Sequence, residues 1–328
     1  MPVLILTDAE IEELLSVADC IPLMETALRE LAEGGAHQPL RMIVQAPGAA
    51  GILALMPAYS ARPTPEFGLK AVGVFPGNVA KGKDAHQGTV TLYDGETGEL
   101  EALMNASAVT AIRTAAVSGV ATKLLAREDA GTLAIIGAGV QARTHLLAMA
   151  AVRPVRVARV TSRDPERARR FVDEMRDRVT FPIEVAPSVE AALSGADLIV
   201  TVTNSAEPVL RRAWVSDGAH INAVGASVPS AREVDSATVA AARLFVDRRE
   251  STINESGDYL VPLGEGVIAD DHIRGELGEL LTGTVPGRRS ETEITLFKSL
   301  GLAVEDLAAA RFLVQEARRQ GAGTLVDF

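Results

Sequence analysis

The pattern of hydrophobic and polar positions changes near Gly131, and the two sides of this point predict different structures. Upstream, short apolar stretches alternate with glycine-containing turns, and one of them, FGLKAVGVF, carries a single charge at Lys70. This pattern is typical of strands joined as hairpins. It predicts an antiparallel sheet whose strands lie at 40–46, 51–56, 67–75 and 88–93.

Helices are expected beside this sheet. Residues 7–34 have helical spacing of apolar positions, and Thr7 and Glu10 have the spacing of a capping box. Residues 107–126 form a second helix, which is rich in small side chains. A last helix at 304–320 is expected to pack back on the N-terminal region.

Downstream of Gly131, short apolar runs alternate with helical segments such as 140–152 and 164–177. Regular alternation of strand and helix is typical of a parallel sheet with helices on both faces. The sequence therefore predicts an α/β fold with a doubly wound Rossmann sheet, beside a smaller α+β domain. The strands of the parallel sheet are expected at 132–137, 155–162, 183–186, 197–203, 220–225 and 243–247.

Charge and cysteine content narrow the classes of partner. The chain has 32 Lys and Arg against 43 Asp and Glu, a net charge of −11. An acidic chain argues against a nucleic-acid partner and against docking on an anionic membrane. We expect no apolar run long enough to span a bilayer. The single cysteine, Cys20, and the absence of a basic start typical of secretory signals favour a cytoplasmic protein.

The segment GAGVQA follows the first apolar strand of the downstream half and begins a helix. Its glycines permit backbone N–H groups to approach a pyrophosphate at the positive end of the helix. This context predicts dinucleotide binding, whereas a tight turn without a ligand or a Rossmann-like methyltransferase are the alternatives. The cofactor-binding residues of the fingerprint are Gly137, Gly139, Val140, Gln141 and Ala142.

The end of the second Rossmann strand indicates the type of dinucleotide. NAD enzymes usually have an acidic residue there that binds the ribose hydroxyls. Here Ser162 and Arg163 stand in that region, and they would suit a 2′-phosphate. Asp164 precedes Pro165, and we interpret it as the cap of the next helix. We therefore favour NADP(H) as cofactor, with NAD(H) as the alternative.

Three cations lie in apolar surroundings. Arg113 is the only charged residue between Ala102 and Thr122, and a buried guanidinium needs an anion. That anion is a protein carboxylate, a phosphate or a substrate carboxylate, and Thr114 would bind it too. Lys70 and Arg41 are either surface residues or further ligands of a small carboxylate. No cluster of His and Cys has metal-ligand spacing, so no metal is predicted.

Together these segments resemble the ornithine cyclodeaminase/mu-crystallin family over essentially the whole chain. The matches are long and occur in the family's order, which makes the resemblance more specific than a Rossmann fingerprint alone. They are LMPAYS (55–60), GLKAVGVFPGN (68–78), HQGTV (86–90), AIRTAAVSGVATKLLA (111–126), GAGVQA (137–142), INAVGAS (221–227), NESGD (254–258) and ITLFKSLGLAVEDLAAA (294–310).

The resemblance implies a homodimer in which a Rossmann domain, residues 119–302, interrupts a substrate-binding and dimerisation domain, residues 1–118 plus 303–328. It implies that Arg41, Lys70 and Arg113 surround a substrate carboxylate and that Leu300 closes the same pocket. It further implies nucleotide contacts by Thr89, Arg113, Val140, Gln141, Ser162, Thr203, Ala223, Val224, Gly225, Ala226 and Ser299.

One position departs from the ornithine-cyclising members of the family. Those members carry an aspartate in a GGD-containing loop, and this chain has Ser227 there. A serine neither holds an ammonium group by charge nor acts as an effective base near neutral pH. The reading Gly225-Ala226-Ser227 is similar to the ketimine-reductase branch instead.

We therefore predict an NAD(P)H-dependent oxidoreductase that acts on the C=N or CH–NH group of a small imino or amino acid. Lys70 would move the nitrogen proton, and Ser227 would orient the imine nitrogen or a nearby water. Three alternatives stay open. They are an ornithine cyclodeaminase that uses NAD, reductive amination of the alanine dehydrogenase type, and an NADP-dependent small-molecule binder without turnover.

Overall fold

The computed structural model describes residues 2–83 and 85–328. The chain divides into two compact units, each described by itself. The first comprises residues 1–113 together with 301–328, and the second comprises residues 114–300. Helix α3 (Ala106–Leu125) begins in the first unit and ends in the second.

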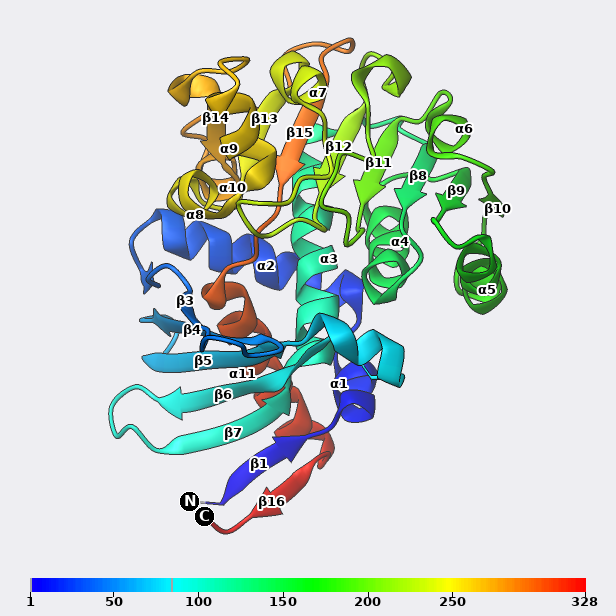
Figure 1. Cartoon of the computed structure of the whole chain (residues 1–328). Helices are drawn as coiled ribbons and strands as arrows, with labels where there is room; N and C mark the ends of the chain where they lie inside the picture. Colours follow the sequence, from blue (N-terminus) through cyan, green and yellow to red (C-terminus); the bar gives the residue numbers. More distant parts are fainter. Residues whose placement is uncertain (1, 84) are drawn as a thin grey trace. The chain divides into compact units, whose positions relative to one another are not determined.

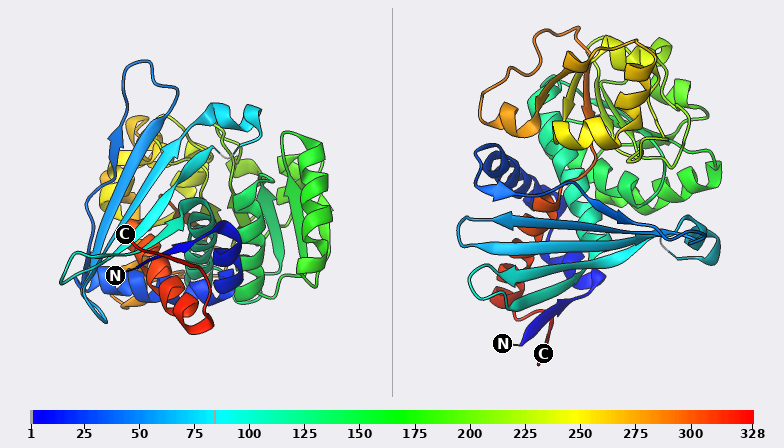
Figure 2. Two further views of the ribbon diagram at one scale, coloured as in Figure 1. Left: turned by 90° about the horizontal axis from the view of Figure 1, so that it is seen from below. Right: turned by 60° about the vertical axis from the view of Figure 1, so that its left-hand side comes forward.

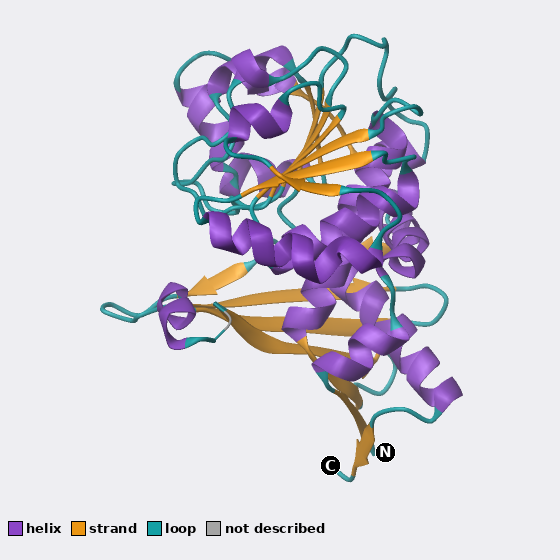
Figure 3. Cartoon of the chain, turned by 90° about the vertical axis from the view of Figure 1, so that its right-hand side faces the viewer, coloured by secondary structure: helices purple, strands orange, loops and turns teal. Residues whose placement is uncertain are grey.

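The first unit contains a mixed sheet in the order β16-β1-β7-β6-β5-β4-β2, with β3 paired to β4. Its long strands are drawn in orange in Figure 3. β1 pairs parallel with β7 and antiparallel with β16, which brings the two chain ends side by side (Figure 2). The predicted hairpin sheet is present, and its outer strands β1, β2, β7 and β16 were not predicted. The strands are β1 (Val3–Leu6), β2 (Ala36–His37), β3 (Met42–Val44), β4 (Ile52–Ser60), β5 (Glu66–Val74), β6 (His86–Asp94), β7 (Leu100–Asn105) and β16 (Thr324–Val326).

The expected helix at 7–34 is two helices, α1 (Asp8–Leu14) and α2 (Val17–Ala32), so the single-helix prediction was wrong. The break occurs because Leu15 is extended and Ser16 starts a new helix by accepting a hydrogen bond from the Asp19 amide. The predicted pair at the first helix start is confirmed, since the Thr7 amide donates to Glu10 over 2.8 Å. A short 3₁₀ helix, η1 (Pro76–Lys81), precedes β6.

Alternation along β4, β5 and β6 gives the sheet two different faces. Ala54, Met56 and Ala58 on β4 are buried, and so is Lys70 on β5. Helix α11 (Ala303–Gln320) packs on β4 and β5 and against α2, as expected for the last helix. Side chains of the opposite face are exposed or half-buried, although many of them are apolar. These are Met42, Val44, Leu53, Leu55, Tyr59, Phe67, Leu69 and Tyr93.

The second unit contains a parallel sheet in the order β10-β9-β8-β11-β12-β15-β13-β14 (Figure 1). The predicted doubly wound α/β fold is confirmed. Two strands, β14 and β15, were not predicted, because short buried strands lack a period that distinguishes them from loops. The strands are β8 (Thr132–Ile136), β9 (Val157–Thr161), β10 (Ile183–Val185), β11 (Leu198–Thr201), β12 (His220–Ala223), β13 (Arg243–Val246), β14 (Ile273–Glu276) and β15 (Thr295–Lys298).

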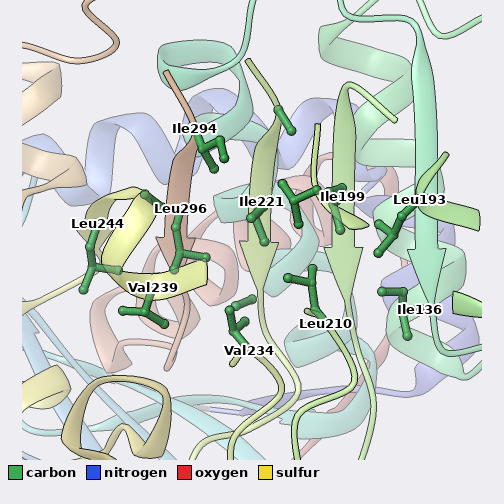
Figure 4. Packing of buried hydrophobic residues seen from close by; sticks show 14 of the residues in the cluster. Ile136, Leu193, Ile199, Leu210, Ile221, Val234, Val239, Leu244, Ile294 and Leu296 are labelled. Atoms are coloured by element: carbon green, nitrogen blue, oxygen red, sulfur yellow. The ribbon is translucent and has the colours of Figure 1, made fainter. Parts of the chain in front are cut away.

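The helices of this unit enclose a core of branched aliphatic side chains. Ile136, Ile199, Ile221 and Leu296 project from four neighbouring strands and pack together (Figure 4). Burial of each such side chain contributes roughly 1.5–3 kcal/mol. The helices are α4 (Val140–Val152), α5 (Pro165–Met175), α6 (Val189–Leu193), α7 (Ser236–Ala241), α8 (Arg249–Glu255), α9 (Gly257–Gly264) and α10 (Leu277–Leu281), with 3₁₀ turns η2 (Arg176–Arg178), η3 (Arg212–Trp214) and η4 (Asp270–His272).

The sequence analysis expected no apolar run long enough to span a bilayer, and helix α3 is an exception. Among the described residues it is the one helix whose length and composition would suffice to cross a membrane. Its most apolar stretch is 83% buried in the structure. Buried core helices pass the same test of length and composition, so the helix is weak evidence for a membrane span.

Candidate active site

Lys70 lies on β5, on the sheet face that α11 covers, and its side chain is 4% exposed. Its Nζ is 2.8 Å from Oδ2 of Asp306, which is in the first turn of α11. Lys70 is therefore neither at a sheet edge nor facing solvent. The solvent-facing alternative is wrong, because β5 pairs with β4 on one side and β6 on the other.

Arg113 is also buried, and it meets the same helix. Its Nη1 donates to Glu305 over 2.7 Å and its Nε donates to Asp306 over 3.0 Å. The anions that Arg113 contacts in the structure are protein carboxylates, which were one of the three kinds of anion considered for it. We call Lys70, Arg113, Glu305 and Asp306 the charge cluster. Its two positive and two negative groups balance, which makes burial of four charges tolerable.

The charge cluster retains hydrogen-bonding capacity. Arg113 has five N–H groups, and its contacts with described residues use two of them. Burial and the nearby Arg113 charge lower the pKa of Lys70 to about 8, against the opposing effect of Asp306. A lysine in this range both holds and releases a proton near neutral pH.

The backbone before α11 brings the two acids into place. Gly301 has a φ of 83°, and a Cβ there would lie 2.5 Å from Nη1 of Arg113, so only glycine fits. Gln38 caps the helix from a distance, since its Oε1 accepts a hydrogen bond of 2.9 Å from the Val304 amide. The helix start then favours the negative charges of Glu305 and Asp306 in its first turn.

The other predicted substrate residues are less closely involved. Arg41 is half-buried just before β3. Leu300 belongs to the second unit, where its side chain is buried and its amide donates to Asp247 over 2.6 Å. The roles of both residues in substrate binding stay predictions.

The fingerprint forms a glycine turn between β8 and α4 in the second unit. Gly137 has a φ of 118°, and a Cβ there would approach the Val202 carbonyl oxygen to 2.6 Å. At Gly139 a Cβ would meet no atom within 4 Å, so the space before α4 is open. This cradle and the exposed helix start fit a pyrophosphate group.

Gln141 supplies a second feature that fits a dinucleotide. Its Oε1 is buried and has no hydrogen-bond partner among the described residues. A buried acceptor without a donor is costly, and a ligand hydroxyl would satisfy it. Ala142 is fully buried against the sheet, whereas Val140 is half exposed.

The end of β9 is followed by Ser162, Arg163 and Asp164. Asp164 accepts a hydrogen bond of 3.0 Å from the Glu166 amide and thereby caps α5, which confirms its structural interpretation. Arg163 is exposed and Ser162 is half-buried. Both are available to a ligand on the sheet edge that carries the fingerprint.

A buried glutamate that the sequence analysis missed connects the loops after β11 and β12. The Glu233 carboxylate accepts hydrogen bonds from the Thr203 amide over 2.6 Å and from the Gly225 amide over 2.6 Å. The hydroxyls of Thr201 and Thr203 donate to it as well. Burial raises the pKa of Glu233, and Lys298 opposes this rise.

Lys298 and Asp258 complete this arrangement, and with Glu233 we call them the loop network. Nζ of Lys298 donates to the carbonyl oxygens of Ala223 and Ala226 and lies 3.1 Å from Asp258. Asp258 in turn accepts hydrogen bonds from the amides of Glu233 and Val234. These contacts fix residues 223–226, which are predicted cofactor contacts.

The remaining predicted residues have varied positions. Ser227 is exposed in the loop that follows β12, and Thr89 lies half-buried on β6. Thr114 is buried on α3, and Ser299 is buried after β15, where its amide donates to Ala223 over 3.0 Å. Within residues 2–83 and 85–328, no group of three or more His, Cys, Asp or Glu side chains is arranged to hold a metal.

The comparisons with known proteins agree with this geometry. Residues 2–321 match the model of the ornithine cyclodeaminase/mu-crystallin family. The chain is 41% identical over 296 residues to ketimine reductase mu-crystallin of Mus musculus, which covers 89% of this chain and 90% of the relative.

Two solved structures are similar over almost their full lengths. One is Delta(1)-pyrroline-2-carboxylate reductase of Thermococcus litoralis in complex with NADH and L-proline, with 40% identity, a TM-score of 0.96 and coverage of 98% and 99%. The other is an archaeal alanine dehydrogenase dimer with bound NAD, with 34% identity, a TM-score of 0.93 and full coverage of both chains. The chain therefore belongs to the ornithine cyclodeaminase/mu-crystallin family.

Proposed function

We propose that this protein is a nicotinamide-dependent reductase of a small cyclic imino acid, in which a C=N bond next to a carboxylate is reduced. The observation that carries the proposal is the buried Lys70–Asp306 pair beside Arg113. Lys70 is a source of protons, and the neighbouring guanidinium of Arg113 is able to bind a carboxylate. The predicted oxidoreductase class, acting on CH–NH groups, is confirmed by the activities of the relatives.

The substrate carboxylate is held by cations of the first unit. Arg113 provides a planar fork whose remaining N–H groups suit two carboxylate oxygens. Its orientation is set by Glu305 and Asp306, so little side-chain freedom is lost when substrate binds. Arg41 adds a further positive charge in this proposal, and Leu300 covers the substrate.

Lys70 handles the nitrogen proton. Reduction adds a hydride to the imine carbon and a proton to the imine nitrogen, so each turnover consumes one proton. With its pKa lowered to about 8, the Lys70 ammonium group holds that proton at neutral pH and gives it up readily. Asp306 keeps Nζ in place, and the exposed Ser227 orients the imine nitrogen or a water molecule.

A nicotinamide dinucleotide supplies the hydride when it is bound. The glycine cradle, Gln141 and the loops fixed by Glu233 are the groups that fit it. Neighbouring structures contain NADH or NAD. For this chain we propose NADP(H) as the preferred form, with NAD(H) also accepted, because Arg163 and Ser162 suit a 2′-phosphate. In the proposal, Thr89, Thr114 and Ser299 also contact the cofactor.

The experiment that tests the function follows cofactor oxidation with pyrroline-2-carboxylate, the cyclic imine that corresponds to the L-proline in the Thermococcus complex. The protein is mixed with NADPH, or separately with NADH, and no ammonia is added. Rapid loss of absorbance at the reduced cofactor's band is the expected result. Absence of oxidation in both mixtures would overturn the proposal.

A second candidate is reductive amination of a 2-oxo acid, favoured by the similarity to an alanine dehydrogenase. Pyruvate with ammonia distinguishes it, because that reaction needs free ammonia and reduction of a preformed imine does not. Ornithine cyclisation is disfavoured, since Ser227 replaces the acidic residue of the cyclising members.

The choice of cofactor has its own test. We expect Ser162→Asp to lower the ratio of kcat/KM for NADPH over NADH by about tenfold or more, because a carboxylate repels the 2′-phosphate and accepts from the ribose hydroxyls. Wild-type and variant rates are compared with each cofactor. An unchanged ratio would remove Ser162 from the account of cofactor choice.

We also propose a homodimer, formed through the exposed apolar face of the first unit's sheet. Met42 and Leu53 on this face are 61% and 43% exposed, and large apolar patches of this kind mark interaction surfaces. Sedimentation is expected to show a dimer for the wild-type protein and a weakened dimer for Leu53→Arg.

The single buried cysteine leads us to propose a cytoplasmic location.

A further inference from the structure

The second unit contains a hollow of about 460 Å³ that the proposed reaction does not use. It lies where β13, β14 and β15 begin, since Arg243, Arg274 and Ile294 stand at or beside the first residues of these strands. The strands are parallel (Figure 1), and the fingerprint follows the carboxyl end of β8. The hollow therefore lies at the other end of the strands, where they begin. Its volume is in the range of roughly 300–1,000 Å³ that small-molecule sites occupy.

Positive charge is concentrated around this hollow. Four of its lining residues are arginines and only two are acids, Asp217 and Glu293, although the whole chain has a net charge of −11. His272 also lines it, with Nε2 bonded to the Val239 carbonyl oxygen over 2.8 Å. The lining arginines are Arg212, Arg243, Arg274 and Arg289.

The two inner arginines are partly compensated by protein groups. Arg212 donates to the Val215 carbonyl oxygen and to Asp217 over 2.7 and 3.0 Å. Arg243, whose side chain is 11% exposed, lies 3.5 Å from Glu293. Its guanidinium carbon is 5.4 Å from the ring centre of Phe245.

The two outer arginines have almost no compensation. Arg274 donates only to the Asp271 carbonyl oxygen, over 3.3 Å, among the described residues. The guanidinium of Arg289 makes no hydrogen bond or ion pair within residues 2–83 and 85–328, because the bond to Glu293 comes from its backbone amide. Both charges lie near Arg243 and lower its pKa together with burial.

We propose that this hollow binds a small, multiply charged oxyanion, a molecule with phosphate or carboxylate groups. Several guanidinium groups that share one hollow repel each other until an anion lies between them. Their planar N–H forks match the oxygens of phosphate and carboxylate groups in pairs. The volume accommodates more than a single phosphate group, so we expect a ligand with at least two anionic groups.

The test measures binding of inorganic pyrophosphate by calorimetry, with NADPH present at saturation. The bound NADPH keeps pyrophosphate away from the glycine cradle and from Ser162 and Arg163, so heat reports on another site. Arg274→Gln combined with Arg289→Gln removes the two uncompensated, exposed charges without touching a buried contact. We expect this double variant to bind pyrophosphate at least tenfold more weakly than wild type, with its NADH oxidation rate unchanged.

The matched control is Arg170→Gln combined with Arg178→Gln. These arginines are also exposed and belong to the same unit, but they do not line the hollow. Wild-type affinity in this control would support a built site. Equal weakening in both double variants would show attraction by general charge only and would overturn the proposal, as would an absence of binding to wild type.

Discussion

The charge cluster and the loop network bury similar groups for different purposes. In the charge cluster, Lys70 and Arg113 face carboxylates and retain N–H groups that no described residue uses. In the loop network, Lys298 and Glu233 bind backbone carbonyls and amides on the loops of the parallel sheet. The charge cluster is able to bind a carboxylate and to exchange a proton, whereas the loop network fixes the backbone conformation of the loops.

The difference shows why burial of a charge does not by itself identify a reacting group. Lys298 is 1% exposed, which is less than Lys70, yet its contacts go to Ala223, Ala226 and Asp258. What distinguishes Lys70 is its neighbour Arg113, whose remaining N–H groups are able to hold a substrate carboxylate. Variants in the two groups should therefore affect different kinetic constants.

The largest effect is expected from Lys70→Met, which keeps the side-chain length and removes the proton donor. General acid catalysis contributes roughly 10²–10⁴-fold, so kcat should fall by about that factor. The variant leaves the charge cluster with a net negative charge, so we expect a loss of stability, while Asp306 keeps its contact with Arg113. Steady-state rates together with thermal unfolding check this prediction. Full turnover in Lys70→Met would remove proton transfer from the role of Lys70.

A smaller effect is expected from Glu233→Gln in the loop network. A glutamine has one acceptor oxygen, with an NH2 donor in place of the second, so the amide of Thr203 or of Gly225 loses its acceptor on the side chain. We expect the KM for NADH to rise about tenfold, kcat to change little, and the free energy of unfolding to fall by about 1–3 kcal/mol. Glu190→Gln, at an exposed position of the same unit, is the control. A fall in kcat alone would contradict the assignment of Glu233 to loop positioning.

The smallest effect is expected from Asp306→Asn, which keeps the shape of the side chain and removes its charge. Asp306 raises the pKa of Lys70 against burial and Arg113. Loss of that charge should therefore move the Lys70 titration to lower pH. The measurement is the position of the alkaline limb of kcat/KM in the variant and wild type. An unshifted limb would mean that Lys70 does not titrate there.

Part of this site could be predicted from the sequence, because a lone charge in an apolar segment is visible. Lys70 and Arg113 stood out for this reason. Lys298 carries the same signal in TLFKSLG, but the strand there was not predicted and the residue was overlooked. Glu305 and Asp306 were missed because acids at a helix start are common and are explained by the helix dipole.

Other features depend on contacts that sequence spacing does not reveal. Glu233 and Asp258 lie in polar stretches, and their burial results from the packing of α9 and the loops after β11 and β12. The parallel sheet of the second unit was predicted because apolar strands and helices alternate there. The outer strands β2 and β16 are two and three residues long, too short to show a period.

The pH dependence of kcat/KM for imine reduction tests the central claim most directly. A lysine with a pKa of about 8 is protonated below that value and loses its proton above it. Since reduction consumes a proton, wild-type kcat/KM should fall as pH rises through about 8, and this limb should be absent from the residual activity of Lys70→Met. Persistence of the same limb in Lys70→Met would assign it to another group and contradict the account.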